Sequence, residues 1–389
     1  MCRKLFYMGL EPYEGRYTLQ LQKWSEEVFK RRHIDYVIVP GETLTTDKAI
    51  TTGQVLDAHG RTFYSLTQHA NLVKLIKEGN VAYNDVIFYE DMFTPGIESL
   101  PYIFDQIEEK YRPRVYVRCL AQTIDPDDFV HVWNMNKWMR NYENMVCNFV
   151  TGILASNEEM VANLKVAGFD LPIYNISGLA FGKREVQSRV SFIPKFQDRP
   201  KRVVFSSRWD QEKQPGFFMD IVESFKDTDI EFAVLSGGPL RSNDQSFVDR
   251  ARALEKTNDN FRVYENLEKN KYYDLLANSR LLFNSALQDW TSNTVSEADA
   301  LGTNVLFPAY RSFPEIFAND HTRLYVPWSI DDAKSKMINL LKTKHPLVGK
   351  ISDWTDATID RCIDIIEQPS CKWLRSSVSY RNHTAESKY

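Results

Sequence analysis

Short apolar runs alternate with amphipathic helical stretches along nearly the whole of this 389-residue chain. An apolar strand, a helix and then another apolar strand form the signature of a parallel sheet with helices on both faces. A chain of this length is also too long to fold around a single hydrophobic core. The sequence therefore predicts an α/β protein with two Rossmann-like, parallel-sheet domains.

The first half carries strand-like runs separated by helical segments. Arg16–Lys30 has large apolar residues at helical spacing, which predicts an amphipathic helix. Its apolar face consists of Tyr17, Leu21, Trp24 and Val28. The other expected helices are Leu66–Lys77 and Phe129–Arg140, and the expected strands are Lys4–Met8, Ile34–Val39, Asp85–Tyr89, Arg114–Val117, Phe149–Ala155 and Pro172–Ile176.

Gly178–Lys201 interrupts this alternation with two glycines, two prolines and a run of basic residues. We therefore expect an amino-terminal domain over 1–178, a linker over 179–200 and a carboxyl-terminal domain over 201–349. The expected strands of the second half are Val203–Ser206, Glu231–Leu235, Phe261–Val263, Leu281–Phe283 and Asn304–Phe307. A last helix is expected over Thr355–Ile366, and the polar tail at 377–389 is expected to be frayed.

The composition is that of an ordinary soluble globular protein, with 43% hydrophobic and 26% charged residues. The cysteines are odd in number, scattered and without a C-x-x-C pair, which favours reduced thiols in the cytoplasm over a disulfide framework or a zinc site. They are Cys2, Cys119, Cys147, Cys362 and Cys371. The opening MCRKLFYMGL is too brief for a signal peptide, and no apolar run has the length of about 18 residues expected of a membrane span.

A net charge of −4 provides no overall attraction to nucleic acid. The charge is uneven, however, because Lys183–Arg202 contains seven Lys or Arg residues and two acids. A solvated linker between the domains is the favoured interpretation of this run. Contact with a phosphate backbone is the alternative.

The stretch Asp289–Pro308, DWTSNTVSEADALGTNVLFP, is expected to form a loop, a short helix ending at Gly302 and a buried strand. Small polar residues stand where the helix begins, so its first N–H groups are free to bind an anion that the helix dipole also attracts. These residues are Ser292, Asn293 and Thr294. Glu297 lies about one turn inside, where it can accept hydrogen bonds from hydroxyls of the same ligand. Phosphate at the amides and sugar hydroxyls at the carboxylate describe a nucleotide-sugar site.

A complementary piece lies upstream, at Val203–Phe218, where an apolar strand leads into a polar turn and then a helix. Arg208 and Lys213 stand on that turn, at the carboxyl end of the strand, where ligands bind in open α/β sheets. Arg208 can fork onto phosphate oxygens and Lys213 can act as a point charge. A surface loop in which they pair with Asp210 and Glu212 is the alternative.

Four motifs of the second half appear in order: SSRWDQEKQPG, SGGPL, an acid–seven residues–acid spacing from Asp289 to Glu297, and ADALGTNVLF. Over residues 200–345 this order and spacing resemble the retaining GT-B glycosyltransferases of the glycogen-synthase-like family 4. In this chain Asp289 stands where the family has Glu, and WTSNT replaces its GFGLP. TVSEADALGTNVLF also has a weaker similarity to phage DNA α-glucosyltransferase.

The resemblance implies roles for individual residues. Arg208 and Lys213 would clamp the diphosphate, Asp289 would bind a hydroxyl of the transferred sugar, and Glu297 would hold the ribose. A plain helix-dipole partner is the alternative for Glu297. The turn beside the nucleotide would contain Gly237 and Gly238, and Tyr264 would stack on the base unless it only packs at its strand end.

In the first half, Gly9 and Gly15 flank a loop that would face the donor phosphates, with a plain turn as the alternative. Glu90 and Asp91 end a strand and would serve as acceptor base, or merely cap the next helix. Where many family members have a histidine after the strand RVYVRCLAQT, this chain has Arg118 and Gln122. Arg118 is therefore the candidate acceptor residue of that strand.

The resemblance implies a GT-B enzyme that moves a sugar from a nucleotide-diphosphate sugar, UDP-sugar first, to an acceptor hydroxyl with retention. No cofactor and no metal is expected, because the two cations and a helix end would neutralise the diphosphate. A glycan or small molecule is the expected acceptor, and a hydroxymethylated base in duplex DNA is the alternative. A non-catalytic protein that only binds nucleotide sugars is the competing class.

Overall fold

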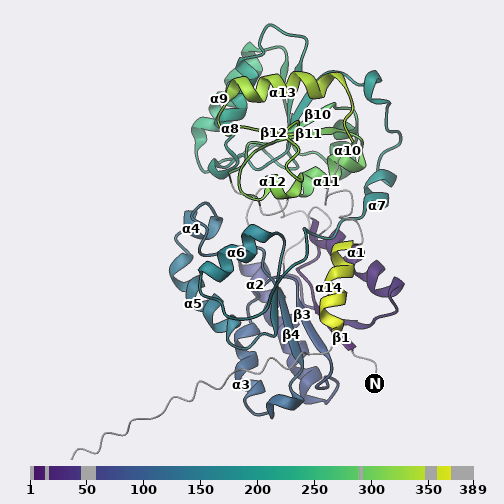
Figure 1. Cartoon of the computed structure of the whole chain (residues 1–389), viewed down its shortest axis with the longest axis vertical. Helices are drawn as coiled ribbons and strands as arrows, with labels where there is room; N and C mark the ends of the chain where they lie inside the picture. Colours follow the sequence, from purple (N-terminus) through teal and green to yellow (C-terminus); the bar gives the residue numbers. More distant parts are fainter. Residues whose placement is uncertain are drawn as a thin grey trace, which may run out of the picture.

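The computed structural model describes residues 4–13, 17–44, 58–287, 289, 292–346 and 357–368. Figure 1 shows two lobes stacked along the long axis of the molecule, with a single helix in the segment that connects them. The first lobe contains β1 (Lys4–Met8), α1 (Tyr17–Arg31), β2 (Asp35–Ile38), α2 (Ala58–Lys77), β3 (Val86–Tyr89), α3 (Leu100–Phe104), β4 (Arg114–Arg118), α4 (Phe129–Val132), α5 (Asn136–Cys147), β5 (Gly152–Ala155), α6 (Glu158–Val166) and β6 (Ile173–Asn175).

The connecting helix is α7 (Lys183–Ser188). The second lobe contains β7 (Arg202–Phe205), α8 (Pro215–Glu223), β8 (Glu231–Leu235), α9 (Gln245–Thr257), β9 (Phe261–Tyr264), α10 (Lys269–Ala277), β10 (Leu281–Phe283), α11 (Asn293–Ala300), β11 (Asn304–Pro308), α12 (Phe313–Ile316), β12 (Leu324–Tyr325) and α13 (Ile330–Lys342). The last described helix, α14 (Ala357–Glu367), lies in the first lobe (Figure 1).

Each lobe is built on one parallel sheet of six strands. The strand order is β2-β1-β3-β4-β5-β6 in the first lobe and β12-β11-β10-β7-β8-β9 in the second. In both sheets the chain runs outward from a central strand in one direction, then returns and continues in the other. That reversal creates a switch point between β1 and β3 in the first lobe and between β7 and β10 in the second.

Alternate residues of β1 show why the first sheet is covered on both faces. Leu5 and Tyr7 pack in one hydrophobic cluster with Leu21 of α1, whereas Phe6 and Met8 pack in another that includes Leu72 of α2. Because successive side chains of a strand point to opposite faces, a wholly apolar strand requires helices on both sides. Full burial of each large side chain contributes about 1.5–3 kcal/mol.

The expected strands are confirmed to within a few residues, and the expected α/β class with two parallel sheets is confirmed. The single helix expected over Phe129–Arg140 is wrong, because the chain breaks between α4 and α5. Asn134 there adopts a left-handed φ of 57°, which ends a right-handed helix. The linker also contains a helix, α7, that was not expected. The domain boundaries at 178 and 201 stay a prediction.

Helix α14 lies against α1 of the first lobe (Figure 1). Its apolar stripe is buried and consists of Ile359, Cys362, Ile363 and Ile366. Two arginines at the end of α1 bind Asp360 of α14, Arg31 at 2.7 Å and Arg32 at 3.1 Å. Helix α14, from the carboxyl-terminal part of the chain, is therefore part of the first lobe.

In the part of the chain that the structure describes, no helix combines the length and the apolar character needed to cross a membrane.

Candidate active site

The second lobe has its switch point between the carboxyl ends of β7 and β10, where a crevice for ligands is expected. A 3-10 turn over Gln211–Lys213 follows β7, and the loop with Asp289 follows β10. The two loops are joined by backbone contacts: Leu287 N donates to Glu212 O at 2.8 Å, and Ser285 Oγ donates to Lys213 O at 2.8 Å. These bonds fix the relative position of the loops.

The loops bring together two residues that the sequence predicted as catalytic. The Lys213 ammonium lies 3.8 Å from an Asp289 carboxylate oxygen. The Lys213 side chain is 9% exposed and that of Asp289 is 23% exposed, so the pair is partly shielded from water. A cation in such a setting acts on a nearby anion more strongly than it would in bulk solvent.

Arg208 adopts the ion-paired arrangement that the sequence offered as the alternative. Its guanidinium lies 2.6 Å from Glu212 and 3.5 Å from Asp210. The Arg208 side chain keeps 28% of its surface exposed. The structure thus accounts for Arg208 as a loop ion pair, and its predicted contact with diphosphate stays a prediction.

Helix α11 begins beside Asp289, with Ser292 at its N-cap and Asn293 and Thr294 in its first turn. The Ser292 hydroxyl bonds the Thr294 hydroxyl at 2.8 Å and makes no capping bond to an amide among the described residues. The first N–H groups of the helix therefore keep their capacity to donate to an anion.

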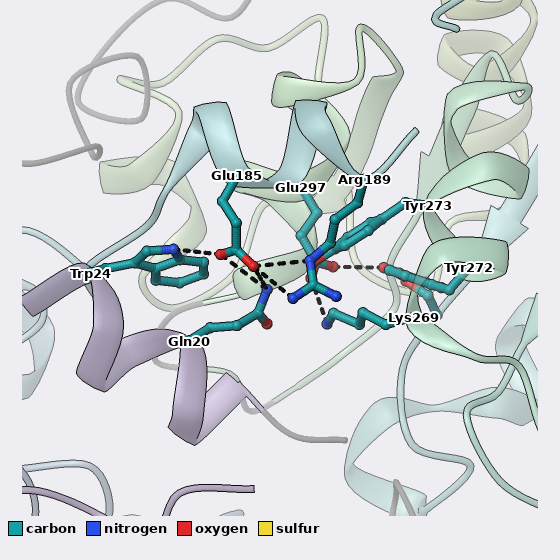
Figure 2. A network of polar contacts seen from close by, with 9 residues as sticks. Gln20, Trp24, Glu185, Arg189, Lys269, Tyr272, Tyr273 and Glu297 are labelled. Carbon is teal, nitrogen blue, oxygen red and sulfur yellow. Dashed lines mark hydrogen bonds and ion pairs between the residues drawn. The ribbon is translucent and has the colours of Figure 1, made fainter. Parts of the chain in front are cut away.

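Glu297 of α11 is held by three donors from α10 (Figure 2). Tyr272 donates at 2.7 Å, and Tyr273 and Lys269 donate at 3.1 Å each. The Glu297 side chain is largely buried, with 9% of its surface exposed. Sequence analysis missed these partners, although their spacing of three and four residues along one helix places them on a common face.

The two tyrosines are fixed in their protonated, donating form. Burial, followed by the charge of Glu297, raises the pKa of Tyr272 well above its usual range. The same causes raise the pKa of Tyr273. Both hydroxyls therefore remain hydrogen-bond donors to Glu297 at every physiological pH.

Residues 186–353 match the model of a family described as Glycosyl transferases group 1. That segment is similar to a group 1 glycosyltransferase domain. It contains the whole site described above, from Arg208 to Glu297. No curated protein matches the chain.

Solved structures with the same two-lobe arrangement share little sequence with this chain. Sucrose-phosphate synthase from Thermosynechococcus elongatus is 10% identical, with a TM-score of 0.59 and 94% of each chain covered. Trehalose-6-phosphate synthase OtsA is 10% identical, with a TM-score of 0.58 over 94% of this chain and 99% of its own. HepE from Anabaena, in complex with UDP and glucose, is 12% identical, with a TM-score of 0.54 over 95% of each chain. These similarities show that the chain has the GT-B fold.

Helix α7 connects the second lobe to the first lobe (Figure 2). Its Glu185 accepts a 2.7 Å bond from the Trp24 indole of α1 and another from Arg189 at 2.7 Å. Gln20 of α1 also donates to Glu185, at 3.4 Å, and lies near the Tyr273 hydroxyl of α10. A chain of polar contacts therefore runs from the first lobe to the residues that hold Glu297.

The predicted nucleotide turn of the second lobe follows β8. Gly238 O accepts a bond from Asn266 N at 3.2 Å, which ties Gly237 and Gly238 to the end of β9. Tyr264 lines an open pocket of about 530 Å³ beside α10, together with Leu267 and Lys271. The pocket also extends to Pro200 and Arg202 at the amino end of β7, and the stacking role of Tyr264 stays a prediction.

In the first lobe, Gly9 directly follows β1. A side-chain carbon at this position would lie 2.9 Å from the Tyr7 ring, so the close approach requires glycine. The Gly9 carbonyl accepts a bond from Gln68 at 3.2 Å. Gly15 lies outside the described residues. The predicted contact of this loop with donor phosphates stays a prediction.

The acceptor residues proposed in the first lobe lie in its interior instead. Glu90 and Arg118 have fully buried side chains and pair at 3.1 Å, and Tyr7 donates to Glu90 at 3.0 Å. Asp91 is 7% exposed and bound by Arg61. Polar residues at strand ends can either bind a substrate or pair with each other inside the fold, and the sequence alone does not distinguish these two roles. In this structure the side chains of Glu90 and Arg118 are fully buried, and their role at the acceptor stays a prediction.

Most basic residues of the linker run make ion pairs or hydrogen bonds with other residues of the chain. Lys183 pairs with Asp299, Arg189 with Glu185, Lys201 with Asp229 and Arg202 with Glu231. Arg199 donates to the backbone carbonyls of Pro194, Ser279, Leu301 and Gly302. The idea that this run contacts a phosphate backbone therefore loses its support.

Proposed function

We propose that this protein is a glycosyltransferase that moves a sugar from a nucleotide-diphosphate sugar to an acceptor hydroxyl. The observation that carries the proposal is the contact between Lys213 and Asp289 at the β7–β10 switch point, next to the start of α11. A cation, a helix end and a hydroxyl-binding carboxylate are the groups that a sugar diphosphate requires. The similarity of the segment that contains them to a group 1 glycosyltransferase domain supports the same reaction class.

Catalysis in this proposal is electrostatic. The bond between the sugar and the diphosphate breaks while the acceptor oxygen bonds the same carbon, and the acceptor proton passes to the leaving diphosphate. Lys213, Arg208 and the first amides of α11 stabilise the charge that develops on the leaving group. Asp289 orients a hydroxyl of the sugar, and Glu297 binds the ribose.

The nucleotide, the stereochemistry, the independence of a metal and the acceptor rest on separate observations. The similar fold of HepE, whose structure contains UDP and glucose, supports UDP as the nucleotide. Retention at the anomeric carbon rests on the motif order of the second half, as does independence of a metal. We propose a glycan or a small molecule as acceptor, because the internal pairing of the basic run leaves the DNA alternative without a specific observation in its favour.

The test is incubation of the full-length protein with a panel of UDP-, GDP- and ADP-sugars, followed by thermal unfolding and nucleotide release. A donor at 100 times its Kd should add about 2.7 kcal/mol of stability. Slow nucleotide release in the presence of the stabilising donor would establish an enzyme. Stabilisation without release from any acceptor mixture would favour the non-catalytic binding protein, and no stabilisation by any donor would refute the proposal.

Replacement of Glu297 by alanine is expected to weaken nucleotide binding by tenfold or more, while turnover at saturating donor falls less. A hydrogen bond to a charged group contributes about 1.5–3 kcal/mol, and this carboxylate is already oriented by α10. Tyr272→Phe should produce a smaller loss in the same direction, because it removes one of the three bonds that hold the carboxylate. Isothermal titration with the stabilising nucleotide measures both.

The matched control for these variants is Tyr36→Phe, which removes a tyrosine–glutamate contact to Glu26 in the first lobe. Its nucleotide affinity should equal that of the unaltered protein. An unchanged affinity in Glu297→Ala would remove Glu297 from the donor site.

A further inference from the structure

A second set of contacts joins the lobes, on the loop between β11 and α12. Arg311 of this loop reaches into the first lobe and binds three carboxylates: Asp125 at 2.8 Å, Asp127 at 2.6 Å and Glu159 at 3.8 Å. Glu315 of α12 accepts a bond from the Glu158 amide, at the start of α6, at 2.9 Å. We call these residues the interlobe cluster.

The loop that carries Arg311 also touches the candidate active site. Ser312, its immediate neighbour, donates from its hydroxyl to the backbone carbonyl of Asp289 at 3.3 Å. Arg311 itself has a left-handed φ of 48°, a conformation that a residue with a side chain adopts only when its surroundings enforce it. The anchoring of Arg311 in the first lobe therefore bears on the position of the Asp289 loop.

The charges of the interlobe cluster do not balance. Asp125 and Asp127 from the loop after β4 and Glu159 from α6 pair with one guanidinium, and Glu315 from α12 adds a fourth carboxylate near Glu159. The side chains of Asp125 and Arg311 are 0% and 14% exposed, so water screens this excess of negative charge only weakly. Asn175 of β6 and Tyr310 are the other polar groups packed here, and Asn175 donates to Glu315 at 3.2 Å.

Two carboxylate oxygens of this cluster are the sites at which a proton would reduce the excess of negative charge. Asp125 Oδ2 and Glu159 Oε2 are buried and have no hydrogen-bond partner among the described residues. A buried carboxylate oxygen without a donor is costly, and a bound proton converts the group into a neutral donor. One proton taken up by the cluster would lower its charge and supply the missing donor.

We propose that the interlobe cluster is a latch that holds the two lobes together over the donor site and that closes when it takes up a proton. In the closed latch, Arg311 is a positioning residue for Asp289. The role in positioning rests on the proposed function. The latch does not rest on the proposed function, because it concerns only the distance between the two lobes.

The direction of the pH dependence follows from Glu159. Burial raises its pKa from an ordinary 4.5 to about 7, against the opposing effect of Arg311 and with the help of Asp125 and Glu315. A pKa raised in the closed form means that the proton stabilises closure. That stabilisation is complete below the ordinary pKa and is lost as the pH rises through about 7.

The test is small-angle X-ray scattering of the full chain at about pH 5.5 and about pH 8.5, on either side of that pKa. The unaltered protein should have a larger radius of gyration at the higher pH. Glu159→Gln should stay compact at both, because a neutral amide replaces the protonated acid. Arg311→Ala should be expanded already at the lower pH, where the unaltered protein is compact, and Arg311→Lys should recover part of the compaction.

Glu78→Gln is the matched control, since Glu78 lies on the first lobe in an exposed contact with Lys74. It should respond to pH as the unaltered protein does. An identical radius at both pH values in the unaltered protein, or an Arg311→Ala radius equal to that of the unaltered protein at the lower pH, would overturn the latch.

A kinetic readout then separates the positioning role from the latch. With the donor identified above, Arg311→Ala should lower kcat by about tenfold or more at pH values where the unaltered enzyme is closed, and Glu159→Gln should shift the alkaline limb of the kcat profile upward. A normal kcat in Arg311→Ala with expanded lobes would refute positioning and leave the latch. A latch response in a protein that turns over no donor would refute the proposed function alone.

Discussion

Replacement of Lys213 by alanine is expected to lower the turnover of a nucleotide sugar by at least about a hundredfold. The departing diphosphate gains negative charge in the transition state, and a fixed cation stabilises that charge more than it stabilises the bound substrate. Lys213 is held by its loop contacts and is largely shielded from water, so its effect is not screened as a surface lysine's would be. Single-turnover measurement of nucleotide release, with the donor that stabilises the protein most, provides the rate.

Two companion variants make this result specific. Lys256→Ala removes the same charge from an exposed position on α9 and should leave the rate within twofold or so of normal. Arg208→Ala distinguishes the two interpretations of Arg208. A loss comparable to that of Lys213→Ala means that the guanidinium leaves Glu212 for the diphosphate, and a normal rate means that it serves only the loop. Normal rates in both Arg208→Ala and Lys213→Ala would end the clamp hypothesis.

Replacement of Arg118 by methionine is expected to lower the free energy of unfolding by about 3–5 kcal/mol. The substitution removes the cation but leaves Glu90 in the core, where a carboxylate without its partner is strongly unfavourable. Burial already raises the pKa of Glu90 even with Arg118 beside it. Urea unfolding followed by tryptophan fluorescence measures the change.

The double variant Glu90→Gln/Arg118→Met should recover much of that loss, since removal of both charges leaves no buried ion behind. Lys201→Ala is the contrasting control. Lys201 and Asp229 lie only 2.6 Å apart, closer than Glu90 and Arg118, but they are 46% and 72% exposed. Their pair should contribute little to stability, because water and salt screen exposed charges. A loss in Lys201→Ala as large as that in Arg118→Met would contradict the argument that burial decides the effect.

The sequence predicted the sheets well because each buried strand is a continuous apolar run. β8 and β10 occupy the expected residues, and β1 does as well. It also predicted that the Lys213 and Asp289 loops would meet, since both follow strands and the carboxyl ends of parallel strands share one edge. The break at Asn134 depended on the φ of a single residue, which no periodicity reveals.

Residues that act across the fold were harder to predict. Tyr272 and Tyr273 read as an ordinary apolar face of a helix, because their hydroxyl partner, Glu297, lies on another element. Arg311 stands alone in a loop, and its partners Asp125 and Asp127 belong to the other lobe, nearly 190 residues earlier in the chain. Only the tertiary structure brings such groups together, so propensity and motif spacing carry no signal for them.

The return of α14 to the first lobe has a consequence for biosynthesis. The ribosome releases the chain from its amino terminus, yet α1 receives the stripe of Ile359, Ile363 and Ile366 only when residues near 367 have left the exit tunnel. Until then the nascent first lobe exposes an uncovered apolar strip while the second lobe is already being made. The lobe that is translated first is therefore the one that matures last, and shortening the chain before α14 would harm the half farthest from the cut.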